Sequence, residues 1–259
     1  MKKLKYFILG SIIVAVVLLV SGSILGGFDQ LETLYQRGEF DIEVPFVETV
    51  DIKNEYSNIE NLEIDCQIGT VDIVEYEGTV IKVEGKNISS TIKVEKDNDT
   101  LVIKDGSQLN RLINFNNDDT GITIFVPFNY HFDKVELEVD AGKMNVANIY
   151  ARDLEVNVDL GSFDADNLVV ENAKIDVDAG DIKINYLDSL DSEFKCDLGD
   201  IDVTLAGLES DYDYKTDCDL GDITISNYES DILKDSNQRG KRSFTADCDA
   251  GKITINMGV

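Results

Sequence analysis

A glycine-centred block recurs seven times in this chain of 259 residues. In each block a short run typical of a β-strand ends in a polar residue, a small or aliphatic residue and a glycine, and a second strand-like run follows. The glycines are Gly69, Gly142, Gly161, Gly180, Gly199, Gly221 and Gly251. From Gly142 to Gly199 they are 19 residues apart, a period that indicates stacked coils.

The positions around the glycine predict an all-β fold, a parallel β-helix (β-solenoid) with coils of about 19 residues. Residues one before the glycine, and two and four after it, are apolar in block after block. Because strand side chains alternate between faces, these positions can share one interior if the chain turns a corner at the glycine. We expect each corner glycine to provide positive φ and a close approach to the next coil. A β-sandwich is the alternative, but it has no reason to repeat one residue type at one offset.

A second column, three residues before each glycine, predicts a core ladder. Its members are Cys66, Val139, Val158, Val177, Cys196, Cys218 and Cys248. Free cysteine packs as a small hydrophobe, and valine replaces it within the column, so we favour packing. We expect the last three cysteines on successive coils, and a disulfide between coils stays an open alternative. The absence of any CxxC spacing argues against a zinc site.

The N-terminus predicts the compartment. Residues 1–5 carry three lysines and are expected to be cytoplasmic, and the uncharged run over residues 6–28 is long enough for a single transmembrane anchor. A cleaved signal peptide is the alternative for this run. Residues 29–54 are expected to form a short juxtamembrane helix and a linker. The protein is therefore predicted to be a single-pass protein of the cell membrane with its C-terminal domain extracytoplasmic.

Two β regions are expected beyond the linker. Residues 55–134 are irregular, with alternating strand patterns and a hairpin signal in KDNDT, and form either irregular coils or a small antiparallel sheet. Residues 135–259 are expected to form the regular solenoid coils. The N-terminal region would cover one open edge of the stack, whereas the C-terminal coil would leave the other edge less protected.

Acidic residues outnumber basic residues in the sequence, 51 to 23. The formal net charge is −28, so nucleic acid is excluded as a partner. Two residues before the glycine, an outward column of aspartates begins at Asp140. We expect it to be solvated, and the sharper hypothesis is a calcium ladder. The metal ligands would be Asp159, Asp178, Asp197, Asp219 and Asp249.

No catalytic constellation is visible, so the chain is not expected to be an enzyme and no cofactor is predicted. The single histidine, His131, is better explained as a strand-edge residue than as a general base. A carbohydrate-active β-helix enzyme is the third hypothesis for function. The insertion between Gly221 and Gly251 gathers three cations, Arg239, Lys241 and Arg242, which form a candidate partner-binding loop or a solvated one.

The chain resembles the bacterial "putative adhesin" domain of unknown function. The matching stretches are the lysine-led segment MKKLKYFILGSIIVAVVLLV, the strand ITIFVPFNY and the repeated blocks from VELEVDAGKMNV onward. The resemblance implies a β-solenoid outside the membrane and supplies no catalytic residues. We therefore expect a cell-surface interaction or scaffold module that binds a cell-wall polymer or a surface protein. An accessory sensor in envelope-stress signalling is the alternative.

Overall fold

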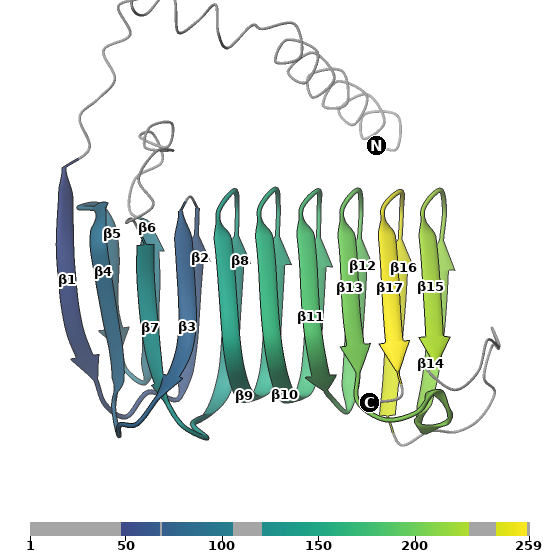
Figure 1. The fold of residues 1–259 in the computed structure, drawn as a ribbon, viewed down its shortest axis with the longest axis horizontal. Coiled ribbons are helices and arrows are strands. Elements are labelled where there is room, and N and C mark those ends of the chain that lie inside the picture. The colour runs from purple at the N-terminus through teal and green to yellow at the C-terminus, as the bar shows by residue number, and fades with distance from the viewer. Residues whose placement is uncertain (1–47, 68, 106–120, 228–241, 258–259) are drawn as a thin grey trace, which may run out of the picture. The chain divides into compact units, whose positions relative to one another are not determined.

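The computed structural model describes residues 48–67, 69–105, 121–227 and 242–257, which form a solenoid of β-strands (Figure 1). The strands join into one continuous 17-stranded sheet. The sheet wraps into two faces because β9 (Lys143–Val158) and β10 (Ser162–Val177), of 16 residues each, run through both faces. The predicted all-β solenoid is thereby confirmed.

The predicted anchor over residues 6–28 and the helix expected after it lie outside the described residues. No helix within the described part of the chain is long and apolar enough to span a membrane. The end of the expected linker is a strand, since β1 begins at Thr49.

The strand order on each face follows from the pairing. Along the first face the order is β5 (Ile92–Asp97), β6 (Thr100–Asp105), β2 (Asn61–Cys66), β8 (His131–Val139), the second halves of β9 and β10, β12 (Asp191–Cys196), β16 (Arg242–Cys248) and β14 (Tyr212–Cys218). Along the second face it is β1 (Thr49–Tyr56), β4 (Ile81–Ser89), β7 (Gly121–Pro127), β3 (Thr70–Tyr76), the first halves of β9 and β10, β11 (Asp181–Asp188), β13 (Asp200–Leu205), β17 (Lys252–Met257) and β15 (Asp222–Asn227). The 3-10 helix η1 (Glu209–Asp211) precedes β14.

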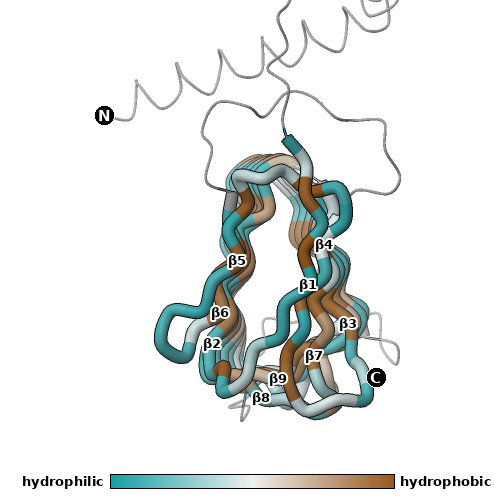
Figure 2. Tube along the Cα trace, turned by 90° about the vertical axis from the view of Figure 1, so that its left-hand side faces the viewer, coloured by the Kyte–Doolittle hydropathy of each residue, from teal (hydrophilic) through white to brown (hydrophobic). Residues whose placement is uncertain are grey.

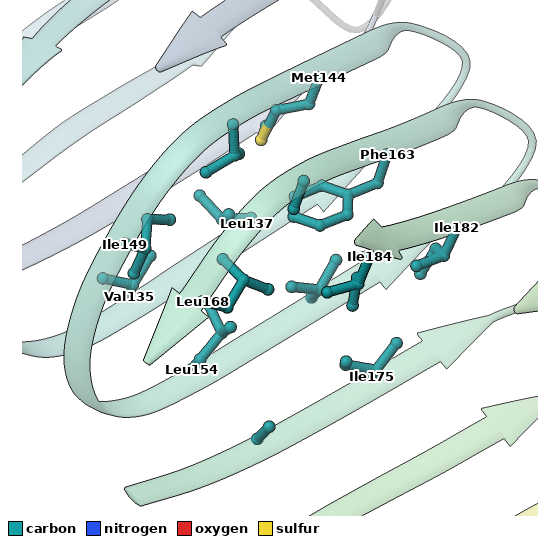
Figure 3. Close-up of a cluster of buried hydrophobic side chains, with 14 of the residues drawn as sticks. Val135, Leu137, Met144, Ile149, Leu154, Phe163, Leu168, Ile175, Ile182 and Ile184 are labelled. Atoms are coloured by element: carbon teal, nitrogen blue, oxygen red, sulfur yellow. The ribbon is translucent and has the colours of Figure 1, made fainter. Parts of the chain in front are cut away.

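The interior is a ladder of apolar side chains from both faces. Burial alternates along most of the strands, although β1, β5 and β14 are largely exposed. In β9 the alternation slips at residues 147–148 and 152–153, where the strand bends from one face to the other. Figure 3 shows the result, with Met144 and Ile149 from β9 meeting Val135 and Leu137 from β8. Figure 2 shows the alternation of apolar and polar residues along the two faces.

The C-terminal coils do not stack in chain order. Strand β16 pairs with both β12 and β14, and β17 pairs with both β13 and β15, so the last coil of the sequence is inserted between two earlier ones. Figure 1 shows the yellow coil β16–β17 between β12–β13 and β14–β15. Cys196, Cys218 and Cys248 do lie on three successive coils, as expected, but their spatial order is Cys196, Cys248, Cys218. The C-terminal strand is covered on both sides, and β14–β15 is the terminal coil among the described residues.

A matching inversion lies at the other end. Strand β6 pairs with β2 and β7 pairs with β3, which places the coil β6–β7 outside the earlier coil β2–β3. Beyond it, β4 and β5 run antiparallel to β7 and β6, and β1 is antiparallel to β4. The KDNDT hairpin is confirmed, with Asn98 at φ 54 in its turn. The region thus combines parallel coils with one reversed coil, so both alternatives for this region were partly correct.

Candidate functional site

The corners of the coils define the most regular surface of the molecule. At each corner the chain passes directly over the preceding coil, so that a Cβ atom added to Gly180 would lie 2.4 Å from the carbonyl oxygen of Gly161 and 2.5 Å from Val158 Cγ1. Glycine is needed here for close approach. Positive φ, which we expected at every corner, occurs among these glycines only at Gly69, at φ 107.

The core ladder is inward, as the burial of its members shows. Val139, Val158, Val177 and Cys248 are at most 1% exposed. Cys218 departs from the prediction because it is exposed. Its coil is terminal, so no further coil within the described residues covers it.

The residue just before each corner glycine points outward, which corrects the expectation that this column belongs to the interior. Leu160, Leu198 and Leu220 are 69%, 39% and 88% exposed. The chain turns at this residue, which is the apex of a tight bend, so strand alternation does not extend to it. The apolar residues at the apex therefore form a solvent-exposed column.

In this column, which we call the corner ridge, alanine and leucine alternate regularly from one coil to the next in space. At each corner the apex amide donates a hydrogen bond to a backbone carbonyl oxygen of the neighbouring coil, for example Leu160 to Asp140, Ala250 to Asp197 and Leu220 to Asp249. In spatial order the ridge residues are Ala141, Leu160, Ala179, Leu198, Ala250 and Leu220. The alternation fails in chain order and is restored only because the C-terminal coil is inserted. Leucines therefore recur at every second coil, about 9.5 Å apart.

The aspartate column lies beside the ridge. The five predicted metal ligands stand on successive coils in the order Asp159, Asp178, Asp197, Asp249 and Asp219. Within the described residues, no group of three or more His, Cys, Asp or Glu side chains is arranged to hold a metal ion. The calcium ladder thus stays a prediction without a formed site.

Burial and then the charges of neighbouring carboxylates raise the pKa values of two acidic groups near the corners. The pKa of Asp159 is raised by burial and then by the charges of Asp178 and Asp140. The pKa of Glu138 is raised by burial and then by Asp65 and Asp140. These groups therefore hold protons more tightly in the folded chain than in the unfolded chain.

Moderate acidification is expected to stabilise the fold. A raised carboxyl pKa gives stability that is fully present at or below the ordinary value and is lost as the pH rises through the folded value. Protonation relieves part of the burial and repulsion that disfavour the charged forms, so we expect the Tm to be a few degrees higher at about pH 4.5 than at pH 7. Differential scanning calorimetry would measure the shift.

The variant Asp159→Asn is the matched test of this pH effect, because it removes the central charge while keeping the shape of the side chain. It should raise the Tm at pH 7 and reduce the gain at pH 4.5. Below the ordinary carboxyl range the gain should reverse, since hydrogen bonds lower the pKa values of Asp153 and Glu155. A Tm that falls steadily between pH 7 and pH 4.5 would contradict the expectation.

The outer faces of the coils carry hydrogen-bonded ladders instead of bare acids. Asn172 donates to Asp153 at 2.7 Å and Asn185 donates to Asp166 at 2.9 Å, each across 19 residues. Lys174 likewise pairs with Glu155 at 2.7 Å. The second face has a shallow depression of about 390 Å³ whose polar lining includes Asp72, Asn145, Asp164, Asp166, Lys183 and Asn185. Hydrogen-bond donors one coil away thus satisfy several of the outer carboxylates.

The predicted cationic cluster is only partly described. Arg239 and Lys241 lie outside the described residues. Arg242 is the first residue of β16, and its Nη1 atom lies 2.7 Å from Asp188 Oδ1, with the guanidinium over the ring of Tyr212 at 5.9 Å. Arg242 therefore links neighbouring coils, and its role in partner binding stays a prediction.

His131 lies at the exposed start of β8. Its Nδ1 atom is 2.9 Å from the carbonyl oxygen of Asn129, and its ring tilts against Tyr150 at 5.4 Å between centroids. No carboxylate contact with the imidazole is seen among the described residues. A turn and an aromatic neighbour thus account for its position.

The fold and the corner surface together define the class of this protein, which is an acidic β-solenoid whose coils turn at Asp-x-Gly corners. The family model described as Toastrack DUF4097 matches residues 59–256, and the chain belongs to this family. The resemblance seen in the sequence is confirmed by this match. None of the curated proteins matches the chain.

Solved structures with a similar fold come from several bacteria. The chain is 16% identical to a putative cell adhesion protein from Clostridium sporogenes, over 82% of this chain and 100% of that one, with a TM-score of 0.47. A putative adhesin from Bacteroides fragilis is 14% identical, over 83% and 99%, with a TM-score of 0.42. A putative lipid binding protein from Parabacteroides distasonis is 15% identical, over 82% and 97%, with a TM-score of 0.33.

Proposed function

We propose that this protein is an extracytoplasmic interaction module, held at the membrane by residues 6–28, that binds its partner along the corner ridge. The observation that supports this is the exposure of Leu160, Leu198 and Leu220 in one line. A rigid row of leucines at regular spacing offers apolar contact at little cost in conformational entropy. The proposed partner is a surface protein or cell-wall polymer.

The negative charge beside the ridge restricts which partners can bind there. The ridge is bordered by the aspartate column, with Asp159, Asp178 and Asp197 exposed beside the leucines. A partner that contacts the ridge must therefore place basic groups against the carboxylates and apolar groups against the leucines. An anionic polymer or an anionic lipid surface would be repelled. Binding should accordingly weaken as salt screens the carboxylates.

A cell-adhesion assay tests the proposal with the full chain. Cells displaying the wild type, or the ridge variant Leu160→Ser/Leu198→Ser/Leu220→Ser, would be bound to plates coated with envelopes of the producing organism. Each lost leucine contact is worth about 1 kcal/mol, so the ridge variant should bind at least tenfold more weakly. External labelling of a C-terminal tag would measure display and normalise binding.

The matched control is Leu190→Ser/Leu208→Ser, which removes exposed leucines that lie off the ridge, at 53% and 45% exposure. It should bind as the wild type does. Equal binding by the ridge variant at equal display would reject the ridge as the contact surface. Failure of the external label to reach the tag would reject the extracytoplasmic placement instead.

A further inference from the structure

The inserted C-terminal coil brings three cysteines into one column. Strand pairing places Cys248 directly opposite Cys196 on one side and directly opposite Cys218 on the other. All three have the same strand phase, so their side chains share one side of the first face. Only an order in which β16 is central gives Cys248 two cysteine neighbours.

The three thiols have different surroundings. Cys196 is 1% exposed and its thiol donates to the carbonyl oxygen of Gly199 at 2.8 Å. Cys248 is fully buried, whereas Cys218 is exposed, and burial and then the neighbouring Cys248 raise the pKa of the Cys218 thiol. Of the two neighbours of Cys248, Cys218 is therefore the one that a reagent in solution can reach.

The spacing permits a bond between Cys218 and Cys248. Facing residues on paired strands lie about 4.8 Å apart, within the Cα separations of about 4.4–6.8 Å found in disulfides. The Cβ atoms must approach by about 1 Å to reach the mean separation in disulfides. The coil β14–β15 can supply that movement, since within the described residues β14 pairs with β16 alone and β15 with β17 alone.

We propose that Cys218 and Cys248 are a disulfide site that oxidation closes to fasten the terminal coil to the C-terminal coil. The oxidant is a small-molecule disulfide. The Cys218 thiolate attacks one sulfur of the reagent, which expels one thiolate and leaves a mixed disulfide on Cys218. The Cys248 thiolate then attacks the Cys218 sulfur and expels the second thiolate. The two cysteines lose two electrons and two protons, and the reagent is reduced to two thiols.

The disulfide would hold the terminal coil β14–β15 beside the C-terminal coil β16–β17 and so stabilise the inverted coil order. Cys218 and Cys248 are 30 residues apart, so the disulfide closes a loop that the unfolded chain would otherwise explore freely. For a loop of this length the chain-entropy model predicts a Tm increase of roughly 7–14 °C. The terminal coil, which among the described strands has a neighbour on one side only, would gain most.

Peptide mapping of the full chain tests the site. After incubation with oxidised glutathione at pH 8, mass spectrometry without reduction should show one Cys218–Cys248 linkage with Cys66 and Cys196 free. The Tm should rise by several degrees, and the rise should disappear on addition of dithiothreitol. Cys218→Ser should abolish both the linkage and the Tm shift.

Cys66→Ser is the matched control, because Cys66 is a buried member of the same column far along the stack. It should leave the linkage and the Tm shift intact. A linkage between Cys196 and Cys248 would overturn the proposal. Stable glutathione on Cys218, or four free thiols after oxidation, would overturn it as well.

Discussion

Replacement of Gly199 by alanine is expected to lower the free energy of unfolding by about 3 kcal/mol or more. A Cβ atom at this position would lie 2.2 Å from the carbonyl oxygen of Gly180 and 2.3 Å from Val177 Cγ1. The oxygen cannot move aside, because it accepts the hydrogen bond from the amide of Asp200 at 3.1 Å. Relief of the clash therefore requires the two coils to separate, and the Tm should fall by roughly 6–12 °C.

Two further variants show whether the backbone contact is responsible. Gly121→Ala is the graded control, since its added Cβ would lie 3.0 Å from the nearest atom, Thr70 O, and it should cost less than half as much. Val177→Ala in the Gly199→Ala background removes the side-chain part of the clash and leaves the carbonyl part. It should not restore stability. Full rescue by Val177→Ala, measured by urea unfolding, would show that glycine is required at this corner only because of the contact with the Val177 side chain.

The periodic part of the fold could be predicted because each coil meets the same chemical environment. The column that contains Val139, Val158 and Val177 has the same role in every coil, so its apolar composition indicates directly that these residues are buried. The order of the coils could not be predicted. All neighbouring coils have nearly the same pairing surface. The spacing from Gly221 to Gly251 reveals an insertion, but it does not reveal on which side of the preceding coil the chain forms its next coil.

The corner ridge was missed for a related reason. Alternation of apolar residues is a valid guide within a strand, but the residue before the glycine is the apex of a bend, where alternation no longer fixes the direction of a side chain. One signal was available. The change between alanine and leucine in this column, from Ala141 through Leu160 and Ala179 to Leu198, is unlike the inward column two residues after the glycine, which holds only valine, methionine, phenylalanine and isoleucine. Such a change of size is typical of an exposed position.

The inverted order places an aromatic cluster at the centre of the last three coils. Phe244 on β16 is 1% exposed. Its ring lies 6.4 Å from Phe194 on β12, 5.7 Å from Tyr212 and 4.7 Å from Tyr214, both on β14, and it stacks on Tyr214 with an interplanar angle of 5°. Phe244 thus contacts a coil that precedes it by some 50 residues and a coil that precedes it by some 30. These contacts exist only if β16 lies between β12 and β14.

Replacement of Phe244 by alanine is therefore expected to cost about 3–5 kcal/mol, because a fully buried ring and its aromatic contacts are lost on both sides. The Tm should fall by roughly 10 °C, and Phe128→Ala, at a ring that is 53% exposed, should change stability by less than about 0.5 kcal/mol. Hydrogen exchange should show lost protection in β12 and in β14 alike. If the coils were stacked in chain order, Phe244 would belong to the last coil and β12 would keep its protection, so an unchanged β12 would contradict the inserted position of the C-terminal coil.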